Sequence, residues 1–291
     1  MKRLICLLLL STTCALGAAK DEAVDPQSGV TVDKMSRLRQ LVPAEKLEAQ
    51  AAQQYGSLKQ QAQQKGVLAP EQDPQVQRLR AIARKLIPHA RQWNDQAAKW
   101  KWEVNLIQAG NVNAFCMPGG KIAFFSGLLD KLKLTDDEVA IVMGHEIAHA
   151  LREHARERMA KGSLLQFGAA IGSAIFGLGD AGQMVVGQGA QLALLKFSRD
   201  DETDADLVGL DIVARAGFDP RAGVTLWRKM GIINNSAPPQ WLSTHPAGKN
   251  RIAQIERNLP RVMPLYAKVK GTSVKALPPY QSNVKEIAPV R

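Results

Sequence analysis

The sequence has few cysteines, few aromatic residues and no long uninterrupted apolar run. Only three cysteines, Cys6, Cys14 and Cys116, occur among 291 residues, and two of them lie close to the N-terminus. If an N-terminal leader is removed, Cys116 alone is left, so no intramolecular disulfide can form in the mature chain. A cysteine cluster for a metal ion is excluded for the same reason, and any metal site must use histidines and carboxylates.

Clustered positive charge is also missing, although the formal net charge is +11. The lysines and arginines are dispersed, without a long basic block or interleaved aromatic residues, which argues against a nucleic-acid-binding protein. The longest apolar stretch beyond the N-terminus, Leu164 to Leu178, is interrupted by glycines and is shorter than the ~20 residues of a membrane span. The remaining composition, 45% hydrophobic and 22% charged, is typical of a globular domain.

The first residues have the pattern of a targeting segment. Lys2 and Arg3 precede the apolar run Leu4 to Leu10, and small residues follow. This order is typical of a secretory signal, so we predict a signal peptide over 1–19 and a periplasmic protein. The residues before Cys14 match a lipoprotein signal poorly, which leaves a lipid anchor at Cys14 as the less favoured alternative.

The chain beyond the leader divides into three parts by composition. Residues 20–73 are predicted to be a helical N-terminal segment: a polar lead-in is followed by Met35 to Gly66, which are rich in Leu, Ala, Gln, Glu and Lys and predict helix interrupted near Pro43. Residues 74–260 carry the apolar periodicities of a folded domain, whereas 261–291 are rich in Pro and Lys and predict an extended tail. Within the domain, the Gly/Ala-rich residues 162–197 predict a helical hairpin that covers the site.

The stretch "KWKWEVNLIQAGNVNAFCMPGGKIAFFSG" changes from helical to alternating periodicity. Trp100, Trp102, Val104 and Leu106 alternate as in a half-buried strand. "NVNAF" and "KIAFFSG" predict two further strands, separated by a Pro-Gly-Gly turn. Three successive strands predict a small antiparallel sheet, and the fold class is therefore α+β and mainly helical.

The stretch "VMGHEIAHAL" carries the strongest chemical signal. Thr135 to Glu138 form a capping-box pattern that begins a helix, which we expect to continue to about Lys161. His145 and His149 are four residues apart and lie on one helix face, where two imidazoles can bind one zinc ion.

Glu146 follows the first histidine and gives the pattern H-E-x-x-H a chemical purpose. Zinc lowers the pKa of a bound water to about 7, and a neighbouring carboxylate can take its proton and pass it to a leaving amine. The five-residue pattern alone also occurs by chance, so a third ligand is required to decide for a zinc site.

The third ligand has to come from another part of the chain. His154 is five residues past His149, out of register for the same helix face, and we expect it on a solvated face. The stretch "SRDDETDAD" offers carboxylates on a second helix, and Glu202 and Asp206 share one face of it. Glu202 would bind the metal and Asp206 would accept a hydrogen bond from a ligand imidazole. Other carboxylates lie nearby, so charge alone does not select Glu202: they are Asp200, Asp201 and Asp204.

"HEIAH", then "SRDDETDAD", then "STHP", occur in an order that resembles the gluzincin family of LoiP-, BepA- and HtpX-like zinc metallopeptidases, which are related to the CAAX-prenyl proteases. "NAFCMPGGKIAFFSGLL" and "AGFDPRAG" are also similar, and the resemblance extends over about Pro74 to Leu259. It implies a zincin-like metalloprotease domain with one Zn²⁺ per chain. No transmembrane spans flank the domain and no helical-repeat domain follows it, so the chain looks most like the compact LoiP-like periplasmic type.

The resemblance also implies roles for individual residues. Glu202 would be the third zinc ligand after His145 and His149, with Asp206 as its helix partner and Glu146 as catalytic base. His245 of "STHP" would lie at the site, either stabilising the oxyanion of the transition state or closing over the metal. An edge strand would bind substrate as an added strand, and it consists of Asn113, Ala114, Phe115 and Cys116.

Together these features predict a zinc endopeptidase of the bacterial cell envelope. Its substrates would be unfolded or misassembled envelope proteins, in a quality-control role that includes outer-membrane proteins. Contact with a membrane surface or with outer-membrane assembly machinery is a further expectation. The alternative is a zinc-containing chaperone or assembly factor with little proteolysis, although such a protein has no need of a general base such as Glu146.

Overall fold

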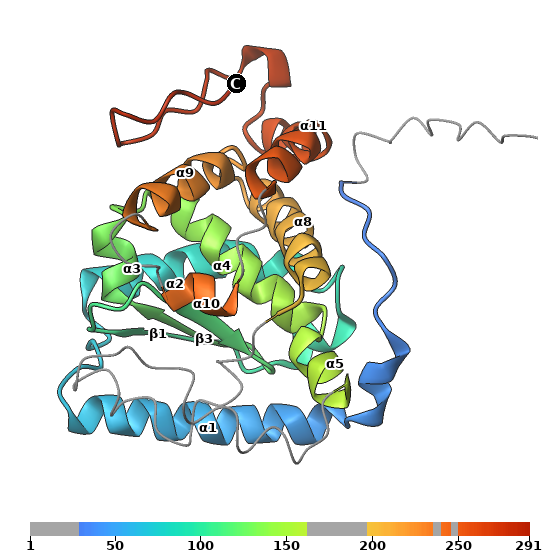
Figure 1. Cartoon of the computed structure of the whole chain (residues 1–291), viewed down its shortest axis with the longest axis vertical. Helices are drawn as coiled ribbons and strands as arrows, with labels where there is room; N and C mark the ends of the chain where they lie inside the picture. Colours follow the sequence, from blue (N-terminus) through green and yellow to red (C-terminus); the bar gives the residue numbers. More distant parts are fainter. Residues whose placement is uncertain (1–28, 162–196, 235–239, 246–249) are drawn as a thin grey trace, which may run out of the picture.

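The computed structural model describes residues 29–161, 197–234, 240–245 and 250–291. Within these residues, helices surround a three-stranded sheet, which agrees with the mainly helical α+β class predicted from the sequence (Figure 1). The predicted signal peptide and nearly all of the predicted Gly/Ala-rich hairpin lie outside the described residues.

The elements have the following bounds. The helices are α1 (Ala44–Gln64), α2 (Pro74–Leu86), α3 (Ser126–Lys131), α4 (Asp136–Leu151), α5 (His154–Lys161), α8 (Arg199–Arg215), α9 (Ala222–Asn234), α10 (Gln240–Thr244) and α11 (Arg251–Val269). The strands are β1 (Glu103–Ile107), β2 (Ala114–Met117) and β3 (Lys121–Phe125). The short 3₁₀ helices are η1 (Arg37–Leu41), η2 (Ile87–His89), η3 (Asp95–Lys99) and η5 (Val274–Ala276).

The sheet is mixed, with the strand order β1-β3-β2. β2 and β3 are antiparallel, whereas β1 and β3 are parallel, so the prediction of an all-antiparallel sheet was wrong for this second pair. A tight turn joins β2 to β3 as a hairpin, and its Gly119 and Gly120 have φ values of 79° and 76° that favour glycine. The link from β1 to β2 is longer than a hairpin turn, so these two strands need not be neighbours. β3 lies between them and pairs with both. β2 is therefore an edge strand.

The two faces of the sheet belong to two hydrophobic cores. Phe115 and Phe125 pack against α1, whereas Ala114 and Phe124 belong to the larger core with α2 and α4. Figure 1 shows α1 along one side of the sheet and α4 on the other. Side chains alternate between the faces of a strand, which explains why neighbouring residues enter different cores. α1 begins after Pro43, where the sequence predicted an interruption.

α4 is the central helix, and the capping box predicted at its start is confirmed. The Thr135 side chain accepts from the backbone of Glu138, whose carboxylate accepts from the Thr135 backbone. Glu138 is fully buried and also accepts hydrogen bonds from Thr225 and Lys229 of α9. A buried carboxylate needs such partners, so the cap of α4 also ties it to α9.

α4 and α8 touch backbone to backbone at two glycines. A Cβ atom added at Gly209 of α8 would lie 2.9 Å from the backbone nitrogen of His145. One added at Gly144 of α4 would lie 3.1 Å from the carbonyl oxygen of Gly209. No side chain fits between the helices here, so both positions need glycine for the observed approach.

The helix that contains the two histidines is shorter than predicted. α4 ends at Leu151 instead of continuing to about Lys161, and a new helix, α5, starts at His154. Between them Glu153 has φ 56°, in the left-handed region. Its carboxylate is held by Arg39 and Arg156, and these ion pairs stabilise the break.

The extended segment predicted from residue 261 onward also differs from the structure. α11 continues through Pro260 and Pro264 to Val269. A proline removes a helical hydrogen bond, but Val262 and Met263 are buried in the larger core. Their burial stabilises this last part of the helix, so α11 ends only at Val269.

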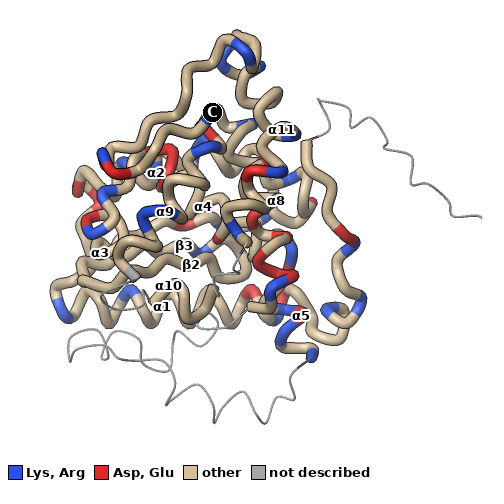
Figure 2. Tube along the Cα trace, turned by 45° about the horizontal axis from the view of Figure 1, so that its top comes forward, with Lys and Arg blue, Asp and Glu red and all other residues tan. Residues whose placement is uncertain are grey.

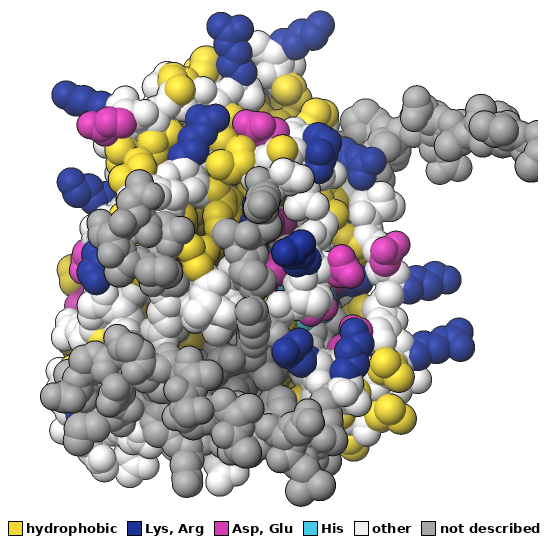
Figure 3. Space-filling model, in the orientation of Figure 1, with side chains coloured by type: hydrophobic (Ala, Val, Ile, Leu, Met, Phe, Trp, Pro, Cys, Tyr) yellow, Lys and Arg dark blue, Asp and Glu magenta, His cyan; other side chains and the backbone are white. Residues whose placement is uncertain are grey.

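Charged residues are distributed over the molecule, with no single basic patch in the view of Figure 2. Acidic residues gather at the start of α8, where Asp200 and Asp201 lie in the first turn (Figure 2). Histidine, in contrast, is barely visible on the face drawn in Figure 3. Among the described residues, no helix combines the length and apolar character that a membrane crossing requires.

The glycine contact between α4 and α8 predicts a position-specific effect of alanine. We expect Gly209→Ala to lower the free energy of unfolding by about 1–3 kcal/mol, because the added methyl group overlaps the α4 backbone. The matched control is Gly56→Ala in α1, where a Cβ meets nothing within 4 Å. That variant should instead gain about 0.5–1 kcal/mol of helix stability. Denaturant unfolding of both variants measures the difference; equal midpoints would contradict the close approach.

Candidate metal centre

Four side chains converge on one point between α4, α8 and α10. Each of His145, His149, Glu202 and His245 offers one ligand atom, and these atoms all lie within 4.8 Å of one another. All four residues are buried, with at most 3% of their surface exposed. Buried histidines and carboxylates in such a group are the donor types that zinc prefers.

The distances between the donor atoms fit one tetrahedral ion. In such a site, with zinc–nitrogen distances of about 2.0–2.1 Å, the ligand atoms lie about 3.3 Å apart. Nε2 of His145 lies 3.0 Å from Nε2 of His149 and 3.6 Å from Oε2 of Glu202. Nε2 of His149 lies 3.4 Å from Oε1 of Glu202. The three residues expected from the sequence as zinc ligands are therefore brought together with suitable spacing.

His245 lies at the fourth corner of the same group. Its Nδ1 is 3.3 Å from Nε2 of His145 and 3.0 Å from Oε1 of Glu202. Its Nε2 is 3.4 Å from Oε1 of Glu146. The fourth position of a catalytic zinc is the one that water needs, and His245 lies at the corresponding place in this group.

Asp206 holds His145 from the side opposite the metal point. Its Oδ1 lies 3.0 Å from Nδ1 of His145, the geometry expected for a carboxylate that fixes the tautomer of a ligand imidazole. Asp206 and Glu202 are both bound by Arg251 of α11, through contacts of 2.6 Å. The Arg251 guanidinium lies 4.2 Å from the ring centre of Trp227. The sequence analysis did not identify Arg251, which lies six residues past His245 and belongs to no spacing pattern.

His154 is buried, so its expected place on a solvated face was wrong. Its Nδ1 lies 2.9 Å from Nδ1 of His149, and its Nε2 lies 3.0 Å from Oδ2 of Asp204. Arg152 donates to the same oxygen of Asp204 at 2.6 Å. The expectation assumed one continuous helix, whereas the break at Glu153 turns His154 back toward the site.

When Nε2 of His149 binds a metal, the donor and the acceptor of each of these hydrogen bonds are fixed. Nδ1 of His149 then carries the proton and donates to Nδ1 of His154. His154 must carry its own proton on Nε2, which it donates to Asp204 in α8. His149 is thus oriented through a second imidazole, whereas His145 is oriented by a carboxylate directly.

Glu146 faces the site from the same helix as the two histidines. Its Oε1 accepts a 2.6 Å hydrogen bond from Nε1 of Trp241, which is almost completely buried. Phe197, which precedes α8, stacks on the ring of His149 with centroids 3.9 Å apart. The sequence did not point to either aromatic residue, because each reaches the site only through the fold.

The electrostatics of the group suit a divalent cation. Burial lowers the pKa of His149 well below its ordinary value, which keeps this imidazole neutral as a ligand must be. Burial by itself opposes ionisation of Glu202, but His245 and His149 together hold its pKa well below the usual range. Two carboxylates, Glu146 and Glu202, face the metal point, whereas Asp206 lies behind His145 and is paired with the Arg251 guanidinium.

The strand expected to bind substrate lies next to α4 at the edge of the sheet. β2 supplies Ala114, Phe115 and Cys116, and Asn113 directly precedes it. The backbone oxygen of Asn113 accepts from the nitrogen of Phe125 in β3. β2 pairs with β3 along one side only. Along its other side, β2 faces no strand among the described residues.

The fold and donor set define a zincin-like metallopeptidase domain. Residues 73–259, more than half of the chain, match the model of Peptidase family M48. The chain belongs to this family, and the predicted fold class, the zinc cofactor and the metallopeptidase class are confirmed at this level.

Several curated proteins are similar to the chain. The mitochondrial metalloendopeptidase OMA1 of Arabidopsis thaliana is 42% identical over 52% of this chain and 30% of its own length. That of Saccharomyces cerevisiae is 29% identical over 73% of this chain and 63% of its own length. The β-barrel assembly-enhancing protease of Escherichia coli is 27% identical over 65% of this chain and 40% of its own length. The matches therefore span less than two thirds of each of these relatives.

The periplasmic location predicted from the first residues is corrected by these comparisons. The relatives of higher identity are mitochondrial proteins, which does not fit a periplasmic protein or its lipid-anchored variant at Cys14. An apolar run that follows basic residues is a targeting signal recognised by a receptor. Its physical pattern does not by itself identify the cellular compartment.

The His149–His154 contact predicts an effect on metal affinity. We expect His154→Phe to weaken zinc binding about 10–100-fold, because the ring volume is kept while the hydrogen-bond partner of His149 is lost. His154→Asn should lose less, since its side-chain oxygen can accept at the position of Nδ1. Chelator competition at fixed pH measures both affinities. Equal affinities in the wild type and His154→Phe would contradict the orienting role.

Proposed function

We propose that the chain is an active zinc endopeptidase that cleaves extended polypeptides. The observation that carries this proposal is the grouping of His145, His149 and Glu202 at tetrahedral spacing, with Glu146 one residue from the first histidine. A purely structural zinc site has no need of a buried carboxylate beside its ligands. The family and the names of the similar proteins support the same activity.

The side chains have distinct tasks in the proposed reaction. Zinc, when bound, polarises the scissile carbonyl and makes water acidic enough to be deprotonated near neutral pH. Glu146 takes the proton of the attacking water and returns it to the leaving amine. The hydrogen bond from Trp241 holds Oε1 of Glu146, which leaves Oε2 to exchange the proton. Asp206 and His154 keep the two imidazoles in the tautomer that binds the metal.

The edge strand β2 supports a preference for unfolded substrates. A peptide that adds to a sheet edge is held by backbone hydrogen bonds, which do not depend on its sequence. A folded protein seldom offers an extended segment with free backbone groups. We therefore propose a role in quality control, with unfolded or misassembled polypeptides as substrates bound along Asn113 to Cys116.

Two substitutions separate metal binding from chemistry. Glu146→Gln should retain about one zinc per chain but lower the cleavage of unfolded casein at least about a hundredfold, since only the base is lost. Glu202→Ala should lose both zinc and cleavage, whereas Asp200→Ala, at an exposed position of the same helix, should lose neither. Elemental analysis and a casein assay measure the two properties.

Wild-type cleavage by Glu146→Gln would contradict the proposed mechanism. Absence of zinc from the reconstituted wild type would contradict the site itself. A zinc-loaded wild type that binds unfolded chains but never cleaves them would instead favour a zinc-containing chaperone.

Substitution of His245 is expected to raise the cleavage rate, whereas Glu146→Gln and Glu202→Ala lower it. Its Nδ1 lies within hydrogen-bond distance of Glu202 and at the corner where water must bind, so it must move before the reaction. We expect His245→Ala to raise the casein cleavage rate severalfold while three ligands retain the zinc. The control is His89→Ala in η2, next to Arg215. Unchanged or lower activity would argue against closing and would favour His245 as the oxyanion donor.

A further inference from the structure

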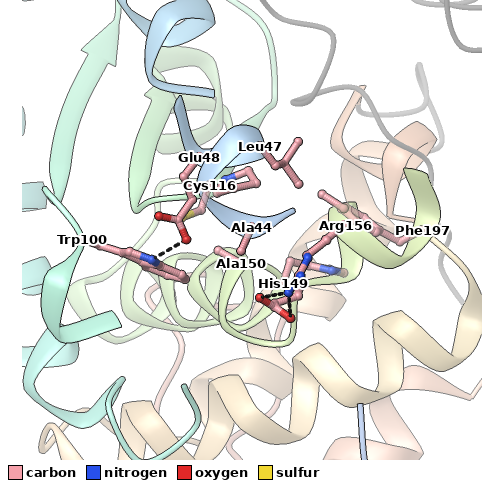
Figure 4. Close-up of a pocket in the computed structure, with 12 residues that line it drawn as sticks. Ala44, Leu47, Glu48, Trp100, Cys116, His149, Ala150, Arg156 and Phe197 are labelled. Carbon is pink, nitrogen blue, oxygen red and sulfur yellow. Dashed lines mark hydrogen bonds and ion pairs between the residues drawn. The ribbon is translucent and has the colours of Figure 1, made fainter. Parts of the chain in front are cut away.

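A small cavity that opens partly to solvent lies beside the metal centre between α1, β2 and the α4–α5 junction. Figure 4 shows Glu48 and Trp100 on one side of it and Arg156 and Phe197 on the other. The complete lining is Ala44, Leu47, Glu48, Trp100, Cys116, Pro118, His149, Ala150, Glu153, Ala155, Arg156 and Phe197.

The cavity borders both the metal-binding group and the edge strand. His149 lines it and also belongs to the metal-binding group. Cys116 lines it from the edge strand β2. A polypeptide added to β2 and reacting at the metal point therefore has one side chain over this cavity, because successive side chains of a strand point to alternate sides.

The chemistry of the wall is mainly apolar. Alanines, Leu47, Pro118 and the rings of Trp100 and Phe197 make up most of it. Its charged groups already have partners. Glu48 accepts a 3.0 Å hydrogen bond from Trp100, and Glu153 is paired with Arg156 at 2.9 Å. Burial also raises the pKa of Glu48, which weakens its preference for a cation. An apolar side chain fits this wall better than a charged one.

The outer wall comes from a part of the chain that the family model does not match. Ala44, Leu47 and Glu48 belong to α1, whereas the match begins at residue 73. α1 is held in place because Arg39 of the preceding η1 is bound to Glu153 at 2.6 Å. The shape of the cavity therefore depends on a helix that lies outside the matched catalytic domain.

We propose that this cavity is a specificity subsite that accepts one apolar substrate side chain, and that α1 determines this preference. The proposal rests on the proposed peptidase function and adds a substrate class to it. Cleavage should therefore occur at bonds that have such a residue at one fixed position, although the strand edge itself accepts any sequence.

The test uses unstructured peptides in which each residue flanking the cleaved bond is varied in turn among Gly, Ala, Val, Leu, Met, Lys and Glu. Wild-type kcat/KM should be at least about tenfold higher for Leu or Met than for Gly at one position, the range typical of apolar pockets. Ala44→Trp fills the cavity and should remove this difference, so that kcat/KM for the Leu peptide falls at least about tenfold, to the level of the Gly peptide. The matched control is Ala49→Trp, an exposed position of α1 that does not line the cavity.

The outcomes are distinguishable. Identical profiles for Ala44→Trp and Ala49→Trp would overturn the subsite, and a preference for Lys that Glu48→Gln removes would overturn its apolar character. If zinc-loaded wild type cleaves no peptide, the proposed function fails. The subsite is then tested by fluorescence anisotropy of labelled peptides bound to the Glu146→Gln variant. Tighter binding of the Leu peptide than of the Gly peptide supports the subsite if the difference is lost when Ala44→Trp is added and is kept when Ala49→Trp is added. Equal binding of the Leu and Gly peptides rejects it.

Discussion

The contact between α4 and α8 at Gly144 and Gly209 is the constraint on which the metal centre depends. α4 supplies two ring nitrogens and α8 supplies a carboxylate, and a zinc ligand set requires these atoms to lie about 3.3 Å apart. Helices usually pack with axes 8–10 Å apart, at a distance set by the side chains between them. With no side chain between the two backbones at this point, the His145 and Glu202 side chains of facing helices reach the same metal point.

Burying this many polar groups is costly, and it is tolerated because these groups have specific partners. Asp206 holds His145, Arg251 holds Glu202, and His154 holds His149, so the three supports come from α8, α11 and α5. Each support reaches the site from a different direction. The donor set is therefore organised by the protein, and a metal ion entering it meets side chains that are already oriented.

Much of the site could be predicted from local patterns, and the errors have physical causes. The capping box at Thr135 and the four-residue spacings of α4 and α8 are properties of a single helix, so they are visible in the sequence. His154 was misplaced because one residue in the left-handed region, Glu153, ends a helix that the apolar pattern alone continues. The parallel pairing of β1 and β3 depends on which strand inserts between two others, and strand propensity does not contain that information.

Residue types at helical spacing were enough to predict the zinc-type donors, the neighbouring glutamate and the helices that carry them. The distant groups that join them, namely Arg251, Trp241 and His154, became visible only in the folded chain, as did the wall that α1 forms in the adjoining cavity. The reason is the range of the interactions. Helical hydrogen bonds and caps act over three or four residues, whereas ligand support and cavity shape depend on packing between segments far apart in the chain.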